Sequence, residues 1–467
     1  MAVEGSEMTR RPPIALPLTV AAMVSLTGAA AVAAQQPAVR FMTVDPGHFH
    51  ASLVHKEMYP QVSPRIDVYA PLGWDLSEHL TRISAYNLRA ERPTAWLAEI
   101  HTGPDFFDRM LRERPGNVVV LAGRNSKKIE YIERSVAGGL NVLADKPWIV
   151  RSADLPRLDA ALARAEAGGL VAYDIMTERY EITNALQREL VNDPAVFGRI
   201  VKDTPENPAV QMTSVHYILK TVSGAPLRRP AWFFDPRELG EALADVGTHL
   251  VDLSIWTLFP ETALDYRRDA RVLSASRWPT VLSRAQFSRT TGEPDFPASL
   301  AQWTRGDSIH CACNTRVVYA LRGTHVKLDV LWGTEAAHGD THEAIYRGEK
   351  ARVEVRQGEG ENWRTEVYVA PNGPAQKGEV LAALQRRVAA LQAKWPGVAV
   401  EERGDRFLVV APDRYRLGHE YHFSEVTSRF LEYLAKPASM PAWERPNMLT
   451  KYFITTAGTD LSQATPR

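Results

Sequence analysis

The chain has 467 residues, 45% of them hydrophobic, so it is long enough for two or three domains with buried cores. Its 55 Lys and Arg residues balance 55 Asp and Glu residues, which gives a formal net charge of +0 at pH 7. This balance argues against a nucleic acid as partner, because nucleic-acid-binding proteins carry basic patches. The two cysteines, Cys311 and Cys313, are expected to be packing residues, since their spacing suits neither a relaxed disulfide nor a four-ligand zinc site.

Residues 1–34 differ in kind from the rest of the chain. Arg10 and Arg11 precede an apolar run that starts at Ile14 and ends in small residues before Gln35. This order is typical of a secretory signal peptide, and the paired arginines also suit the twin-arginine route. We expect export to the periplasm or beyond, with no stable membrane span after cleavage. The alternative is an uncleaved anchor helix of about 20 residues.

The region after the signal opens with a strand, a tight turn and the start of a helix. The apolar run Val39–Val44 is followed by the turn Asp45–His50. This order predicts the first unit of a Rossmann-like dinucleotide-binding domain, although the usual G-x-G-x-x-G loop reads D-x-G-x-x-H here. The loop residues that we expect at the cofactor are Asp45, Gly47, His48, Phe49 and His50. The alternative for Asp45 is that it only caps the following helix.

Further apolar runs predict the other strands of a parallel sheet, with helices between them. These runs are Ile66–Ala70, Asn117–Ala122, Asn141–Asp145 and Gly169–Tyr173. A polar and aromatic stretch up to about Gly103 interrupts this alternation after the second strand and either shapes the cleft or covers a sheet edge. Neither an acid for a ribose diol nor an arginine cluster for a 2′-phosphate follows that strand, so NAD and NADP both stay open.

Three side chains further along the chain predict a catalytic constellation. Asp245 and His249 are four residues apart in a segment with helical spacing, so they lie on one helix face, where the acid can orient a general acid/base histidine. The alternative is a helix-start acid beside a core histidine. Lys146 ends a strand at the edge of the sheet where ligands bind, which brings an ammonium group to the same site.

These motifs, in this order, resemble those of the Gfo/Idh/MocA oxidoreductases, the glucose-fructose oxidoreductase and inositol dehydrogenase family. The resemblance extends from about Val39 to about Leu331. The Glu-Lys-Pro signature of the family reads Asp145-Lys146-Pro147 here, its Asp-x-x-x-His helix reads Asp245–His249, and its arginine-aromatic pair reads Arg179-Tyr180.

The resemblance implies that a sugar carbon exchanges hydride with NAD or NADP between Lys146 and His249, with Asp245 as the orienting acid. It also implies cofactor contacts for Asn125, Asp145, Lys146 and Arg179. The polar and aromatic residues His216, Tyr217, Lys220 and Trp232 are expected substrate contacts, because aromatic faces pack on sugar rings and His and Lys donate to hydroxyls. A homodimer or homotetramer is expected from the same resemblance.

The second half of the chain has a different pattern. Alternating stretches such as Ile200–Val210 and Arg316–Leu331 predict a mostly antiparallel sheet. From about residue 335 the chain extends beyond the short family members, and a helix over 420–434 is expected to pack on the second domain. The predicted fold class is α/β, with a Rossmann-like doubly wound parallel sheet in residues 35–174 and an α+β domain with a mostly antiparallel open-faced sheet in residues 175–467.

The predicted function is that of an exported NAD(P)-dependent oxidoreductase acting on the CH–OH group of a carbohydrate. Two alternatives stay open: a redox-neutral NAD-dependent glycosidase, and a non-catalytic sugar-binding protein on a decayed dinucleotide fold. No metal site is predicted, since the H-x-x-x-H pattern His338–His342 lies in a loop-like stretch and is expected to be a solvated turn.

Overall fold

The structure is a computed structural model that describes residues 39–222, 225–336 and 338–464. The predicted signal peptide, residues 1–34, lies outside the described residues. Within the part of the chain that the structure describes, no helix is long and apolar enough to cross a membrane.

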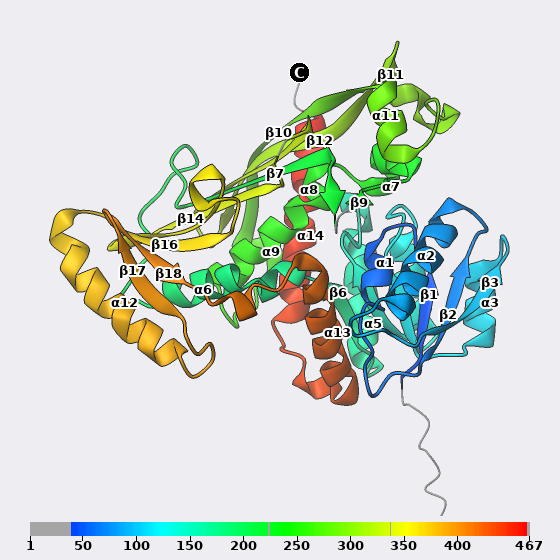
Figure 1. The fold of residues 1–467 in the computed structure, drawn as a ribbon, viewed down its shortest axis with the longest axis horizontal. Helices are drawn as coiled ribbons and strands as arrows, with labels where there is room; N and C mark the ends of the chain where they lie inside the picture. Colours follow the sequence, from blue (N-terminus) through cyan, green and yellow to red (C-terminus); the bar gives the residue numbers. More distant parts are fainter. Residues whose placement is uncertain (1–38, 223–224, 337, 465–467) are drawn as a thin grey trace, which may run out of the picture. The chain divides into compact units, whose positions relative to one another are not determined.

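A six-stranded parallel sheet with the order β3-β2-β1-β4-β5-β6 forms the core of the first half of the described chain (Figure 1). This order confirms the predicted doubly wound, Rossmann-like fold. The strands are β1 (Phe41–Val44), β2 (Arg65–Ala70), β3 (Leu97–Thr102), β4 (Val118–Leu121), β5 (Asn141–Asp145) and β6 (Ala172–Ile175). The helices are α1 (His50–Leu53), α2 (Trp74–Leu88), α3 (Phe106–Glu113), α4 (Lys128–Ala137) and α5 (Leu155–Ala167).

The stretch after β2 corrects one expectation, because it continues the alternation of strands and helices. Helix α2 buries Leu76, His79 and Ile83, which recur at helical spacing, and β3 then adds the edge strand of the sheet. The polar residues between these positions hide the periodicity in the sequence. The helix that follows β1 departs from the fold in another way, since α1 spans only four residues.

The second half contains a ten-stranded sheet in which all neighbours are antiparallel except β13 and β7. Its mostly antiparallel character was predicted. The strands are β7 (Val210–Leu219), β10 (Ala270–Ser283), β11 (Thr304–Arg305), β12 (Ser308–Leu321), β13 (Thr324–Glu335), β14 (Thr341–Arg347), β15 (Ala351–Gln357), β16 (Glu366–Pro371), β17 (Ala399–Arg403) and β18 (Arg406–Val410). Strands β8 (Thr221–Val222) and β9 (Ala225–Pro226) form a separate hairpin.

The strand expected at Ile200–Val210 is wrong. Ile200 makes only an isolated bridge to Gly348, and the strand begins at Val210. Pro205 and Pro208 explain the difference, because a proline has no N–H group to donate to a neighbouring strand.

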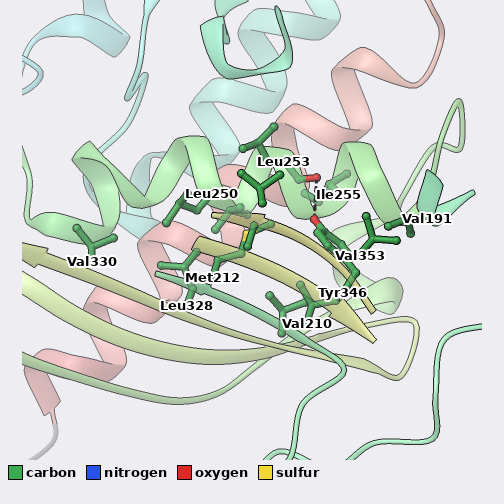
Figure 2. Packing of buried hydrophobic residues seen from close by; sticks show 14 of the residues in the cluster. Val191, Val210, Met212, Leu250, Leu253, Ile255, Leu328, Val330, Tyr346 and Val353 are labelled. Atoms are coloured by element: carbon green, nitrogen blue, oxygen red, sulfur yellow. Dashed lines mark hydrogen bonds between the residues drawn. The ribbon is translucent and has the colours of Figure 1, made fainter. Parts of the chain in front are cut away.

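Helices cover the sheet of the second half and carry several site residues. They are α6 (Ile182–Val191), α7 (Pro236–Leu239), α8 (Ala242–Asp245), α9 (Gly247–Leu258), α10 (Tyr266–Asp269), α11 (Arg284–Thr291) and α12 (Lys377–Leu391). Leu250 and Leu253 of α9 pack toward Met212 and Leu328 of the sheet (Figure 2). Cys311 and Cys313 are buried in the same core, as expected. Burial of this apolar face fixes how α9 lies on the sheet.

Two C-terminal helices, α13 (His419–Ala435) and α14 (Glu444–Ala464), join the first sheet to the rest of the chain. We expected the helix over 420–434 to pack on the second domain, but α13 buries its apolar residues in the core that contains Phe41 of β1 and Leu53 of α1. These α13 residues are Phe423, Val426, Phe430, Leu431 and Tyr433. Because α1 is a single turn, a face of the sheet would otherwise lack cover, and α13 supplies it.

Replacement of Phe430 by alanine tests this contact. Phe430 is fully buried, so Phe430→Ala should lower the free energy of unfolding by about 3–5 kcal/mol, which a shift of the urea midpoint followed by circular dichroism would report. Glu432→Ala on the same helix is the control, since Glu432 is exposed and forms only a surface pair with Arg429. Equal midpoints for the two variants would contradict the placement of α13.

Candidate active site

A cavity of about 700 Å³ lies where the carboxyl ends of the parallel strands meet the second sheet and helix α13. From the first half it is lined by His48, Phe49, His50, Lys56 and Lys146. From α13 and the residue before it come Gly418, His419, Glu420 and Tyr421. The other polar or charged lining residues are Glu178, Ser214, His216, Lys220, Arg229, Asp245, Thr341, Asp340, His342 and Gln357, together with His249 of α9. Its size is that of a site for a small molecule.

Lys146 and Asp245 form the ion pair at the centre of this cavity. Lys146 follows β5, Asp245 ends α8, and the Lys146 Nζ to Asp245 Oδ1 distance is 2.5 Å. Burial acts to raise the pKa of the Asp245 carboxyl, but the Lys146 ammonium outweighs it and brings the pKa to about 2. Burial acts to lower the pKa of Lys146, yet Asp245 and Asp145 raise it overall. The pair is therefore charged at neutral pH.

His249 lines the same cavity but does not pair with Asp245, which corrects the predicted acid–histidine contact. The helix is interrupted at Val246, between α8 and α9, so the carboxylate turns to Lys146 instead. Nδ1 of His249 is buried and has no hydrogen-bond partner among the described residues. Burial, followed by the nearby Lys146 charge, lowers the pKa of His249 to about 4. A neutral imidazole therefore faces the cavity at neutral pH and can accept a proton.

The Asp145 carboxylate binds two histidines from the D-x-G-x-x-H segment, which stands where a glycine-rich loop is usual. Nδ1 of His48 lies 3.1 Å and Nδ1 of His50 2.9 Å from Asp145 Oδ2. Burial lowers the pKa of both imidazoles. Burial also acts to raise the pKa of Asp145, but the two histidine donors hold it well below its usual range. The predicted loop residues His48, Phe49 and His50 thus lie in the cavity wall.

Other predicted residues lie outside the cavity. Arg179 is held by Asp252 at 2.6 Å and Glu444 at 3.0 Å, so its donors are used inside the protein, and the preceding residue Glu178 lines the cavity instead. Asn125 donates through its side chain to the carbonyl of Leu239 at 2.6 Å. Neither side chain lines the cavity, and cofactor contact by Asn125 and Arg179 stays a prediction.

The predicted substrate residues divide into two groups. His216 and Lys220 line the cavity and are tied to Asp340, with His216 Nδ1 at 2.9 Å from Asp340 Oδ2. Tyr217 does not line it, because its ring packs against Gly333 on the neighbouring strand β13. Trp232 also lies elsewhere, over the loop after β1.

The segment expected to be a solvated turn contributes to the cavity wall. His338 is exposed and stacks on Trp363, whereas His342 is the second residue of β14 and burial lowers its pKa to about 4. Asp340, Glu178, Arg229 and His419 are further site residues that the sequence reasoning missed. The H-x-x-x-H pattern was the signal that could have identified Asp340 and His342. His419 had no such signal, since it comes from a helix 170 residues after His249.

The crevice that would hold the adenosine and phosphate portion of a dinucleotide is closed. Trp232 donates to Asp75 at 3.1 Å, and a Cβ added to Gly47 would lie 3.0 Å from both side chains. Arg124 also binds Asp75, at 3.2 Å. The cavity left there is about 30 Å³, far below the roughly 300 Å³ of a small-molecule site. Asp45 is buried under this cover, and burial raises its pKa to about 6. A dinucleotide does not fit these residues unless the Trp232 indole leaves Gly47.

The fold and the site together are those of an oxidoreductase with a Rossmann-like first half. Residues 186–463 match the family model "Putative oxidoreductase C terminal domain". This match covers more than half of the chain, so the chain belongs to that family.

Comparison with individual proteins agrees with this assignment. A crystal structure of a "putative oxidoreductase" from Parabacteroides merdae ATCC 43184 is 43% identical, covers 92% of this chain and 98% of that chain, and has a TM-score of 0.89. The 3-ketoreductase KijD10 from Actinomadura kijaniata, crystallised with TDP-benzene and NADP, shares the fold at 14% identity over 91% of this chain and 97% of its own, with a TM-score of 0.53. The predicted cofactor class, a nicotinamide dinucleotide, includes the NADP in the crystal structure of this neighbour.

A curated relative matches a shorter segment. The "Putative oxidoreductase YteT" of Bacillus subtilis (strain 168) is 25% identical over 154 residues, which are 33% of this chain and 32% of that protein. The match therefore spans about a third of the curated relative.

Removal of the Lys146 charge should raise the pKa of His249. That charge is the second cause, after burial, of the low value of about 4, and Lys146→Gln also leaves the Asp245 carboxylate unpaired near the ring. NMR titration of histidine-labelled protein, with the His249 signal assigned by its loss in His249→Gln, would measure the shift. Lys327→Gln, outside the cavity, is the control. A His249 pKa unchanged in Lys146→Gln would show that the two groups do not interact.

Proposed function

We propose that this chain is an oxidoreductase of the Gfo/Idh/MocA type that acts at the CH–OH or carbonyl group of a sugar or sugar derivative, with NAD or NADP as cofactor. The observation that carries the proposal is the convergence of Lys146 and His249 on one cavity of about 700 Å³ at the carboxyl edge of the parallel sheet. This edge is where open α/β sheets bind their ligands. The oxidoreductase family and the ketoreductase neighbour support the same class.

His249, Lys146 and Asp245 have separate roles in the transfer of the hydroxyl proton. The neutral imidazole of His249 accepts the proton of the substrate hydroxyl as general base. The Lys146 ammonium donates a hydrogen bond to the oxygen on which negative charge develops, and Asp245 holds this ammonium charged and in place. Hydride chemistry would be supplied by the nicotinamide ring of a bound dinucleotide. The proton steps depend only on residues in the cavity wall.

Polar side chains on the second sheet suit the binding of a hydroxylated ring. His216 and Lys220 are oriented by Asp340, and Arg229 is held over the rings of Phe233 and Trp332 at 4.3 and 5.1 Å from their centroids. Imidazole, ammonium and guanidinium groups all donate hydrogen bonds to sugar oxygens. We also propose that the protein is exported, that it forms a homodimer or homotetramer, and that its first domain ends at residue 174.

A second candidate is a sugar-binding protein that uses no dinucleotide. The closed crevice beneath Trp232 favours it, because it leaves about 30 Å³ where phosphates would lie. Incubation of the purified protein with candidate sugars and each oxidised dinucleotide separates the classes. Reduced nicotinamide accumulates with a dehydrogenase, an aglycone is released without it by a redox-neutral glycosidase, and neither appears with a binding protein.

Loss of His249 should abolish most of the turnover. His249→Ala and Lys146→Ala are each expected to lower kcat by about 10²–10⁴-fold, because His249 accepts the hydroxyl proton and Lys146 stabilises the negative charge that develops on the same oxygen. Steady-state rates with the best sugar from the screen would measure this. His325→Ala is the control, since His325 binds Asp203 at 3.0 Å and lies outside the cavity. Wild-type rates in both cavity variants would refute the assignment.

Removal of the Trp232 indole should strengthen dinucleotide binding. A bound dinucleotide has to break the hydrogen bond between Trp232 and Asp75, and a bond to a charged group is worth about 1.5–3 kcal/mol. Trp232→Ala should therefore lower the Kd for NAD or NADP by about tenfold or more in calorimetry. Trp363→Ala, which changes an indole stacked on His338, should leave the Kd unchanged. Equal affinities of wild type and Trp232→Ala would mean that the indole does not gate the crevice.

A further inference from the structure

Two histidines in the wall of the cavity meet the carboxylate of an aspartate buried behind them. His48 lies on the loop after β1 and His50 is the first residue of α1, and Asp145 ends β5 two strands away in the sheet. The imidazole rings are 3.9 Å apart between centroids. One ligand atom from each of the three residues lies within 4.8 Å of the others.

The distances in this cluster suit a metal ion. Both Nδ1 atoms lie 2.9–3.1 Å from Asp145 Oδ2. Ligand atoms that bind one metal at about 2.1 Å and at right angles are about 3.0 Å apart. In the structure the histidines donate Nδ1–H to the carboxylate, and transfer of these protons to Nε2 would turn both Nδ1 atoms into ligands.

A second observation also points to a ligand. Asp145 is 2% exposed, yet its other oxygen, Oδ1, is buried and accepts no hydrogen bond from the residues that the structure describes. A buried carboxylate oxygen without a donor costs about 1–3 kcal/mol or more, and native structures keep few such atoms. A cation that also contacts Oδ1 would remove this cost.

We propose that His48, His50 and Asp145 bind one divalent first-row transition metal ion, such as Zn²⁺, Fe²⁺ or Mn²⁺, through a 2-His-1-carboxylate set. Three protein ligands leave coordination positions open, and both histidines border the cavity, so a water molecule or a sugar oxygen can fill them. The ion would act as a Lewis acid on that oxygen. This site goes beyond the proposed function, which uses neither a metal nor these residues as bases.

The surroundings of the cluster support it as a built site. The ring of Phe423 of α13 packs on His50 at 4.6 Å between centroids, and Lys128 fixes the end of β5 by donating to the Asp145 carbonyl at 2.8 Å. The ammonium of Lys146, next in sequence, is paired with Asp245. A cation at the cluster therefore does not face this lysine as an unpaired charge.

A second cluster on the sheet, with one histidine and two acids, serves as an internal control. Asp67, Glu99 and His101 also bring ligand atoms within 4.8 Å. Arg40 already binds Asp67 at 2.7 Å, and Arg65 binds Glu99 at 2.7 Å. The guanidinium groups donate hydrogen bonds to these carboxylates. This cluster therefore contains no buried carboxylate oxygen without a donor, unlike Asp145 Oδ1.

The test is metal binding by the full chain, with any affinity tag removed, after treatment with a chelator. Titration with Co²⁺ should give a visible d–d absorption band that saturates at one equivalent, and Zn²⁺ should displace the Co²⁺. Asp145→Asn and His48→Gln should each weaken binding by about 100-fold or more, as expected for loss of a ligand. His101→Ala should bind as the wild type does.

Three outcomes would overturn the proposal: no saturable Co²⁺ binding by the wild type, binding that survives in both Asp145→Asn and His48→Gln, or binding that is lost in His101→Ala. Circular dichroism verifies that each variant is folded, and His48→Gln supplies the test should Asp145→Asn fail to fold. Neither sugar nor dinucleotide is present, so a negative result leaves the oxidoreductase proposal intact, and an inactive protein that binds Co²⁺ leaves this one intact.

Discussion

A buried network of charges fixes the position of helix α9, and with it the position of His249. Lys451 of α14 is 1% exposed and binds Asp174 of β6 at 2.9 Å and Asp252 of α9 at 3.1 Å. Arg179 binds the same Asp252. Loss of one partner from a buried ion pair costs about 3–5 kcal/mol, because the other charge stays buried. Asp252 lies one helical turn after His249, so the bonds that tie it to the parallel sheet also hold the histidine over the cavity.

Helix α13 makes the C-terminal extension part of the site. The one-turn helix α1 leaves a face of the sheet without cover, and the apolar residues of α13 fill that face. The start of the same helix carries His419, which lies 3.2 Å from Glu178 across the cavity wall. The shortened helix α1, residues 50–53, thus requires a helix from the end of the chain. This helix both stabilises the sheet and encloses the substrate cavity.

Local pattern predicted five of the six parallel strands, the Rossmann-like fold and the strand end at Lys146, because apolar runs and strand ends are encoded nearby in sequence. Strand β3 was not predicted, and the meeting of Lys146 and His249 at one cavity was implied by the family resemblance. Three features could not be predicted in this way. The contact of Asp245 depends on an interruption of the helix at Val246. The destination of α13 depends on which surface α1 leaves open. Helix α14 was hidden because its buried face is rich in threonine, whose hydroxyls bond back to the helix, as Thr456 does to Tyr452 at 2.7 Å.

The loop after β1 lacks most of the usual glycines, and its backbone packs closely on the end of β4. In a G-x-G-x-x-G loop the lack of side chains lets a pyrophosphate reach the backbone. Here the loop backbone packs on the residues that follow β4. The His48 N–H donates to the Ala122 carbonyl at 3.0 Å, and a Cβ added to Gly123 would lie 1.9 Å from the Asp45 carbonyl oxygen. Loop and strand therefore pack too tightly to admit phosphates between them. His48 and Phe49 line both the crevice beneath Trp232 and the cavity. Changes in this loop are therefore expected to alter dinucleotide affinity and the chemistry of the histidines together.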